Sequence, residues 1–89
     1  MFHRQQTACI AVLSILVGNW KSVDSLNTLL HAYSRYIIGR MGIPYPKENV
    51  NIISIAMDAP REKISALSEK IKNLKGVTVT AAYAENFAD

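Results

Sequence analysis

Cysteine is almost absent from this chain of 89 residues, and Cys9 is the only one. No disulfide can form within the chain, so we expect a reducing compartment, the cytoplasm. Because Cys9 lies in an apolar run, we expect a buried side chain and not a nucleophile or a metal ligand. Histidine is also scarce, with only His3 and His31, so the sequence lacks the His and Cys clusters that hold transition metals. We therefore expect no metal site and no cofactor.

Catalytic and nucleic-acid-binding motifs are missing as well. The sequence has no Gly-rich phosphate loop, no nucleophile motif and no pair of carboxylates that the expected elements would bring together. Its ten Lys and Arg residues are scattered, apart from Lys70, Lys72 and Lys75, which we interpret as the solvated face of a helix. The expected central strands have no aromatic residues to stack on RNA bases. We expect a protein that is not an enzyme and does not bind nucleic acid.

The composition that remains is ordinary for a globular protein, with 49% apolar residues, 19% charged residues and a net charge of +3. The length suits one domain with a thin core. We place it at residues 7–84, between a frayed tail at 1–6 and another at 85–89. The apolar run at 8–17 is similar to a short secretory signal, but no small-x-small cleavage site follows it, and the fold needs it as a strand. It is also too short to cross a bilayer, so we expect no membrane association.

Apolar runs alternate with amphipathic segments along the chain. A helix is predicted from Trp20 to about Tyr33, capped by Asn19, and a second from Pro60 to Gly76, because their apolar residues recur at spacings of three and four. Apolar runs rich in β-branched residues predict four strands, at residues 7–17, 37–43, 50–57 and 77–83.

The resulting order, βαββαβ, is the ferredoxin-like plan of an α+β domain. Right-handed crossovers place the strands in the order 4-1-3-2, antiparallel throughout, with both helices on one face. Prolines near the end of the second strand mark it as an edge strand. The first and third strands form the middle pair and are apolar on both faces, whereas an antiparallel sheet covered on one side usually shows polar residues on the other. We therefore expect the uncovered face to be buried in a homo-oligomer, a dimer or tetramer.

Two segments have residues that suit a small ligand. Gly18 and Asn19 precede the first helix, where backbone amides are available to an anion or carboxylate. Arg40 is a charge in an apolar edge strand, and Gly42 allows close approach of the backbone. The alternative is that Arg40 only guards the edge against aggregation and that Tyr45 closes the hairpin. The candidate ligand-binding or interface residues are Gly18, Asn19, Arg40, Met41, Gly42, Tyr45 and Asn51.

The run IIGRMGIPY at 37–45, with VNIIS at 50–54, closely resembles the signature of a family of small proteins described as regulators of the iron-only hydrogenase system. The segments ISAL at 64–67 and LKGV at 74–77 fit the same pattern. The resemblance implies a domain similar to ACT regulatory domains and to the C-terminal domain of the nickel-responsive repressor. Those domains assemble through their sheets and bind amino acids or metals at or near subunit interfaces. The repressor's nickel ligands have no counterpart here, and this chain carries no DNA-binding segment.

Together these observations predict a non-catalytic, homo-oligomeric regulatory module that senses a small ligand, such as an amino acid, at a subunit interface. The alternative is a structural module whose partner is another protein. An enzyme would be favoured if Arg40 and Asp58, on neighbouring strands, converged in a closed pocket.

Overall fold

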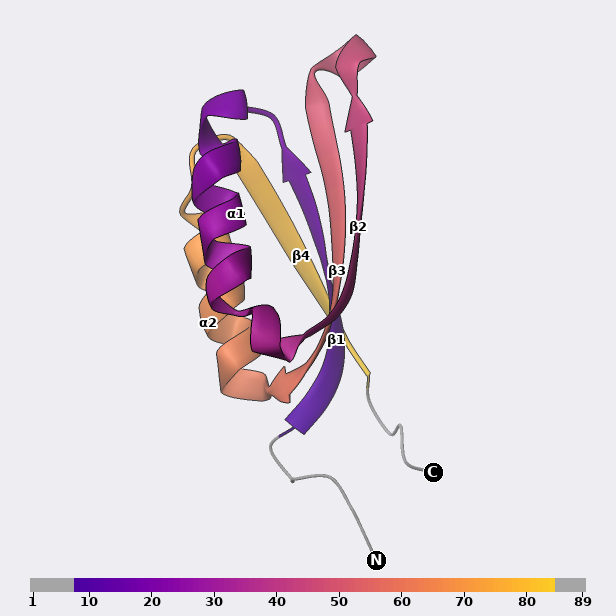
Figure 1. Ribbon diagram of the computed structural model, residues 1–89, viewed down its shortest axis with the longest axis vertical. Helices are drawn as coiled ribbons and strands as arrows, with labels where there is room; N and C mark the ends of the chain where they lie inside the picture. Colours follow the sequence, from indigo (N-terminus) through magenta and orange to yellow (C-terminus); the bar gives the residue numbers. More distant parts are fainter. Residues whose placement is uncertain (1–7, 85–89) are drawn as a thin grey trace, which may run out of the picture.

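The computed structural model describes residues 8–84, and the tails predicted at 1–6 and 85–89 lie outside these residues (Figure 1). Two helices cover one face of a four-stranded antiparallel sheet, and the other face is open. The helices are α1 (Val23–Ala32) and α2 (Arg61–Lys72), and the strands are β1 (Ala8–Val17), β2 (Ile37–Tyr45), β3 (Val50–Pro60) and β4 (Val77–Tyr83). The sheet order β2-β3-β1-β4 is the predicted 4-1-3-2, so the ferredoxin-like, ACT-like α+β fold is confirmed.

Element boundaries differ from the predicted ones at several ends. β2 runs on through Pro44, which is tolerated because β2 is an edge strand whose outer amides need no ladder partner. The first helical segment starts as a 3-10 turn at Trp20–Ser22 before α1 begins. Asn19 caps that turn as predicted, since its side-chain oxygen accepts a hydrogen bond from the Lys21 amide at 3.0 Å. α2 ends before Gly76, which lies in the following turn with a φ of 71°.

The hydrophobic core fills the space between the sheet and the two helices. Side chains alternate along β1, so that every second residue faces the helices and is buried. Cys9 is half-buried and packs against this core. The fully buried large side chains are Leu13, Ile15, Leu26, Leu30, Ile55, Met57, Ile64, Leu67, Ile71 and Val17.

Two turns at one end of the molecule are fastened together. The Gly18 amide donates to the Gly76 carbonyl at 2.8 Å, and the buried Ser22 hydroxyl donates to the Lys75 carbonyl at 2.6 Å. These two bonds join the turn after β1 to the turn before β4, and we call the pair the turn clamp. It fixes the start of α1 relative to the sheet.

The β2–β3 hairpin projects past the helices at the same end of the molecule (Figure 1). The helices lie on one side of the sheet (Figure 1), and the outer strand β2 is exposed from Ile38 to Tyr45. α1 approaches this strand at Asn27, whose side-chain oxygen accepts a hydrogen bond from Arg40. Among residues 8–84, no helix is long and apolar enough to cross a membrane.

Candidate functional site

The open face of the sheet carries a group of exposed apolar side chains. Leu16 of β1 pairs with Ile52 of β3, which in turn pairs with Ile43 of β2, so the three form a row across the sheet. Their exposed fractions are 48%, 38% and 50%. Met41 lies on the same face in the next row and Val12 in the row after that, and both are also exposed. We call these five residues the open-face patch.

Polar side chains of small size interrupt this patch. Ser14 of β1 pairs with Ser54 of β3 on one side and with Thr80 of β4 on the other. Leu16 pairs with Thr78 of β4, so its row is apolar only across β1, β3 and β2. The row between Leu16 and Val12 combines these hydroxyl groups with Met41. The sequence predicted an apolar face broken only by Ser54, and Ser14 on the neighbouring strand adds a second hydroxyl group beside it.

The opposite face of β2 borders a groove between this strand and α1. Residues alternate along a strand, so Arg40, Gly42 and Pro44 face the helix layer while Met41 faces the open side. Two cavities lie beside β2, and residues of α1 line only the larger one. The larger, about 440 Å³, is lined by Asn27, Leu30, His31, Ser34, Ile37 and Arg40. The smaller, about 190 Å³, is lined by Val17, Trp20, Pro44, Tyr45, Pro46, Asn49, Val50 and Asn51.

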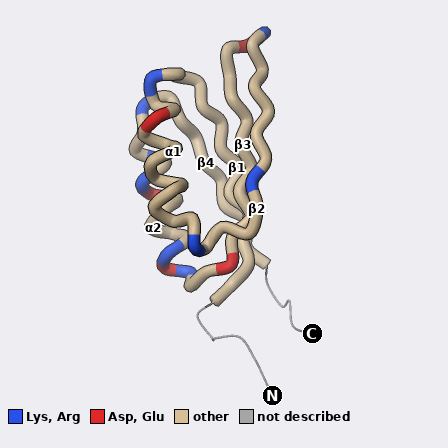
Figure 2. Tube along the Cα trace, viewed as in Figure 1, with Lys and Arg blue, Asp and Glu red and all other residues tan. Residues whose placement is uncertain are grey.

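We call the larger space the Arg40 cavity, because Arg40 is the one Lys or Arg side chain among the residues that line it. Arg40 is the only charged position along β2 and is visible as a single blue segment on that strand in Figure 2. Its guanidinium donates to the side-chain oxygen of Asn27 at 3.4 Å, a long bond to a neutral group. Leu30 is 2% exposed and provides an apolar wall. The cavity therefore combines a weakly engaged guanidinium with a buried hydrocarbon surface.

We call the smaller space the Trp20 cavity, and it lies beside the tip of the hairpin. Trp20 is 71% exposed, which is high for so large an apolar side chain. Tyr45 and Asn51, both predicted site residues, contribute to its lining. Gly18 and Asn19 precede Trp20, but the Gly18 amide is bonded to Gly76 and is not free to bind an anion.

The predicted residues are thus distributed over several places. Arg40 lines one cavity, Tyr45 and Asn51 line the other, and Met41 belongs to the open face. Sequence reasoning missed Asn27, His31 and Ser34, whereas Trp20 belongs to the segment after the first strand that it singled out. Asn27 and His31 stand one helical turn apart on α1, beside the buried Leu30. That spacing was the available signal, but it identifies a site only once β2 is known to lie opposite.

Arg40 and Asp58 do not converge. Arg40 pairs with Ile55, which is fully buried under the helices, so both face the helix layer. Asp58 pairs with Ile10 and is exposed, and its position along β3 places it on the opposite face from Ile55. The arrangement that would have favoured an enzyme is absent from residues 8–84.

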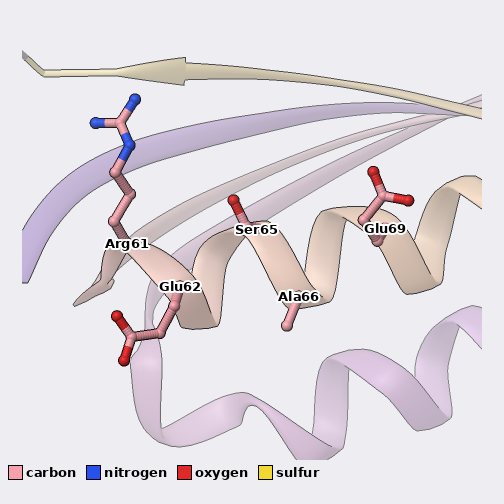
Figure 3. Close-up of a pocket in the computed structure, with 5 residues that line it drawn as sticks. All are labelled: Arg61, Glu62, Ser65, Ala66 and Glu69. Carbon is pink, nitrogen blue, oxygen red and sulfur yellow. The ribbon is translucent and has the colours of Figure 1, made fainter.

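Two further hollows lie on the helical side of the molecule. One, about 530 Å³, is lined by α2 alone (Figure 3). In Figure 3 Arg61 and Ser65 extend toward the sheet, whereas Glu62 and Ala66 point toward α1. The guanidinium of Arg61 stacks over the Tyr83 ring at 3.9 Å, which accounts for its position. The other, about 520 Å³, lies between the helices and is lined by Asp24, Ser25, Thr28, Leu29, Lys70, Asn73 and Leu74. Within the described part of the chain, no three His, Cys, Asp or Glu side chains form a metal-binding group.

A model of a protein family matches most of the chain. Residues 9–81 match the family described as "TM1266-like: Iron-only hydrogenase system regulator, putative". No curated protein matches the chain.

One solved structure supports the same relationship, and a second shares only the fold. The uncharacterized protein TM1266 from Thermotoga maritima is 32% identical, with a TM-score of 0.84 over 88% of this chain and 99% of that one. A formyltetrahydrofolate deformylase from Pseudomonas putida KT2440 has a TM-score of 0.61 and 13% identity. This chain covers only 29% of the deformylase, and at that identity the likeness shows a shared fold alone.

Proposed function

The chain belongs to the TM1266-like family, and from this premise we propose a non-catalytic, homo-oligomeric regulatory module of the iron-only hydrogenase system. It assembles through the open face of its sheet and works in the cytoplasm. It senses a small ligand in the groove between α1 and β2. Because β2 borders both the groove and the open face, the ligand site lies at the edge of the subunit interface.

The exposed apolar row across the open face carries this proposal. Leu16, Ile52 and Ile43 are each at least 38% exposed although they stand in three adjacent strands of one sheet. A contiguous apolar surface of this kind is uncommon on monomers and typical of interfaces.

A second copy of the chain is the partner that fits this face best. Apart from Asp58 at the far end of β3, every described open-face position of the four strands is uncharged. Two identical faces can therefore meet around a two-fold axis without bringing like charges together. Ser14, Ser54 and Thr80 give the interface hydroxyl groups that both donate and accept hydrogen bonds.

Light scattering coupled to size-exclusion chromatography tests the assembly. We expect a dimer or tetramer at micromolar concentration, and we expect Leu16→Asp to shift the protein to monomer because it buries a carboxylate in an apolar interface. Ser25→Asp on the exposed face of α1 is the control, since it adds the same charge on the opposite layer. A wild-type monomer, or an unchanged mass for Leu16→Asp, would show that the open face is not the interface.

A structural module that binds another protein is the second candidate, and the exposure of Trp20 favours it. Tryptophan is enriched among residues that dominate protein–protein binding energy. If Trp20→Ala abolished binding to a hydrogenase-system protein while no small molecule stabilised the chain, this second function would replace ligand sensing.

A further inference from the structure

We infer that the Arg40 cavity is a binding site for a small monocarboxylate, with Arg40 and Asn27 as its anchoring residues. This inference rests on the proposed regulatory function and names the chemical class of the ligand. A free carboxylic acid and the carboxylate of an amino acid share the chemistry that would be recognised.

The donor groups in the cavity match a carboxylate. A guanidinium presents two parallel N–H groups that bind both oxygens of a carboxylate. Arg40 uses one terminal nitrogen in its long bond to Asn27, at 3.4 Å, which leaves the remaining N–H groups for a ligand. The amide nitrogen of Asn27 adds two further donors, and the His31 and Ser34 side chains line the same space.

The charge of the cavity favours a single negative charge. Among the described residues that line it there is one Arg and no Asp or Glu, so a cationic ligand has no ionic partner there. His31 and Ser34 lie at the carboxyl end of α1, where the helix dipole is negative. That end opposes any anion, and it opposes a phosphate dianion more than a carboxylate, because one guanidinium offsets a single negative charge. The ammonium of an amino acid would be favoured there.

The remaining surface of the cavity suits a hydrocarbon body. Leu30 is almost fully buried and Ile37 is half-buried, and both line the space. A volume of about 440 Å³ lies within the range of small-molecule sites. The ligand class is therefore a short carboxylic acid or amino acid with an apolar side group.

The competing interpretation is that Arg40 only protects the edge strand from aggregation. In that case Arg40→Met would increase aggregation, and no carboxylate would bind. Ligand binding by the soluble protein therefore separates the two interpretations.

Thermal denaturation and isothermal titration calorimetry at constant ionic strength provide the test. The probes are butanoate and leucine, with butanamide as the neutral match of butanoate and phosphate as the dianion. We expect butanoate, leucine or both to raise the melting temperature of the wild type and butanamide and phosphate to have no effect. Stabilisation by butanoate alone identifies a simple acid, and stabilisation by leucine alone identifies an amino acid.

Variants connect this binding to the cavity. Arg40→Met should weaken carboxylate binding at least about tenfold, because a charge-assisted bond is lost. Asn27→Ala, on the exposed side of α1, should weaken carboxylate binding less. This variant replaces Arg40→Met in the test if Arg40→Met folds poorly. Arg35→Met is the matched control, because Arg35 stacks on Tyr36 and does not line the cavity. Equal binding by Arg40→Met and Arg35→Met, or no binding of either carboxylate to the wild type, overturns the inference.

The oligomeric state, measured by light scattering, tests the proposed assembly independently of this test of carboxylate binding. An oligomer that binds neither butanoate nor leucine overturns the monocarboxylate site and leaves the regulatory assembly standing. A monomer that binds butanoate through Arg40 overturns the assembly and leaves the site.

Discussion

At the residue scale, Gly76 is the position where the backbone is most restrictive. Its φ of 71° lies in the left-handed region, and a Cβ there would come within 2.6 Å of the Asn19 Cβ. Gly76→Ala should lower the free energy of unfolding by about 2 kcal/mol or more, since it adds left-handed strain to a steric clash. Urea denaturation measures the change.

Gly18→Ala is the control for that substitution. Gly18 belongs to the same turn clamp, but its φ is not left-handed and a Cβ would lie 3.5 Å from the Gly76 carbonyl, an ordinary contact. We expect a change within about 1 kcal/mol. Equal destabilisation by both variants would contradict the account of Gly76.

Single residues also show what the sequence could and could not reveal. Asn19 was predictable as a cap because its side chain acts on the chain two residues ahead. The hydrogen bond from the Gly18 amide to the Gly76 carbonyl was not predictable, because it joins residues far apart in sequence. A hydrogen bond between residues close in sequence can be predicted from the sequence, whereas one between distant residues can be predicted only once the fold is known.

At the scale of the element, β1 contributes one face to the core and the other to the proposed interface. Leu13 is fully buried under the helices, and Leu16 is 48% exposed on the open side. Leu13→Ala should lower the free energy of unfolding by about 2–5 kcal/mol at every protein concentration, because it leaves a cavity in the core. Leu16→Ala should destabilise only the assembled protein, so its effect should shrink on dilution.

Denaturation at several protein concentrations checks this contrast. The two substitutions remove the same atoms from the same strand, so each serves as the control for the other. If Leu16→Ala were as costly as Leu13→Ala at the lowest concentration, Leu16 would contribute to the fold of the single subunit and not to an interface.

Elements were easier to predict than the space between them. The apolar periods of two and of three to four gave all four strands and both helices, and handedness gave the sheet order. The groove beside β2 could not be predicted from these patterns, because its shape depends on how far α1 extends across the sheet. Asn27 and His31 therefore become candidate site residues only when the structure places them in the same cavity as Arg40.

At the scale of the whole molecule, β2 is where the two proposed surfaces meet. Arg40 faces the groove and the next residue, Met41, faces the open side. In the proposed assembly this one edge strand would contact both the ligand and the partner subunit. A bulge between Ile37 and Gly39 interrupts the pairing of β2 with β3 just before Arg40. The strand is thus less firmly held there than the central pair.

A ligand that fixes Arg40 against α1 should order β2 and lower the cost of ordering Met41 and Ile43 on assembly. We therefore predict that butanoate or leucine, whichever binds, tightens the oligomer, lowering its dissociation constant about fivefold or more. Sedimentation equilibrium with and without the ligand measures this change. Arg40→Met should remove the effect, and Arg35→Met should retain it. Because linkage is reciprocal, the assembled protein must bind the ligand more tightly by the same factor. If the dissociation constant of the oligomer were the same with and without a bound carboxylate, ligand binding in the groove would not be coupled to assembly through the open face.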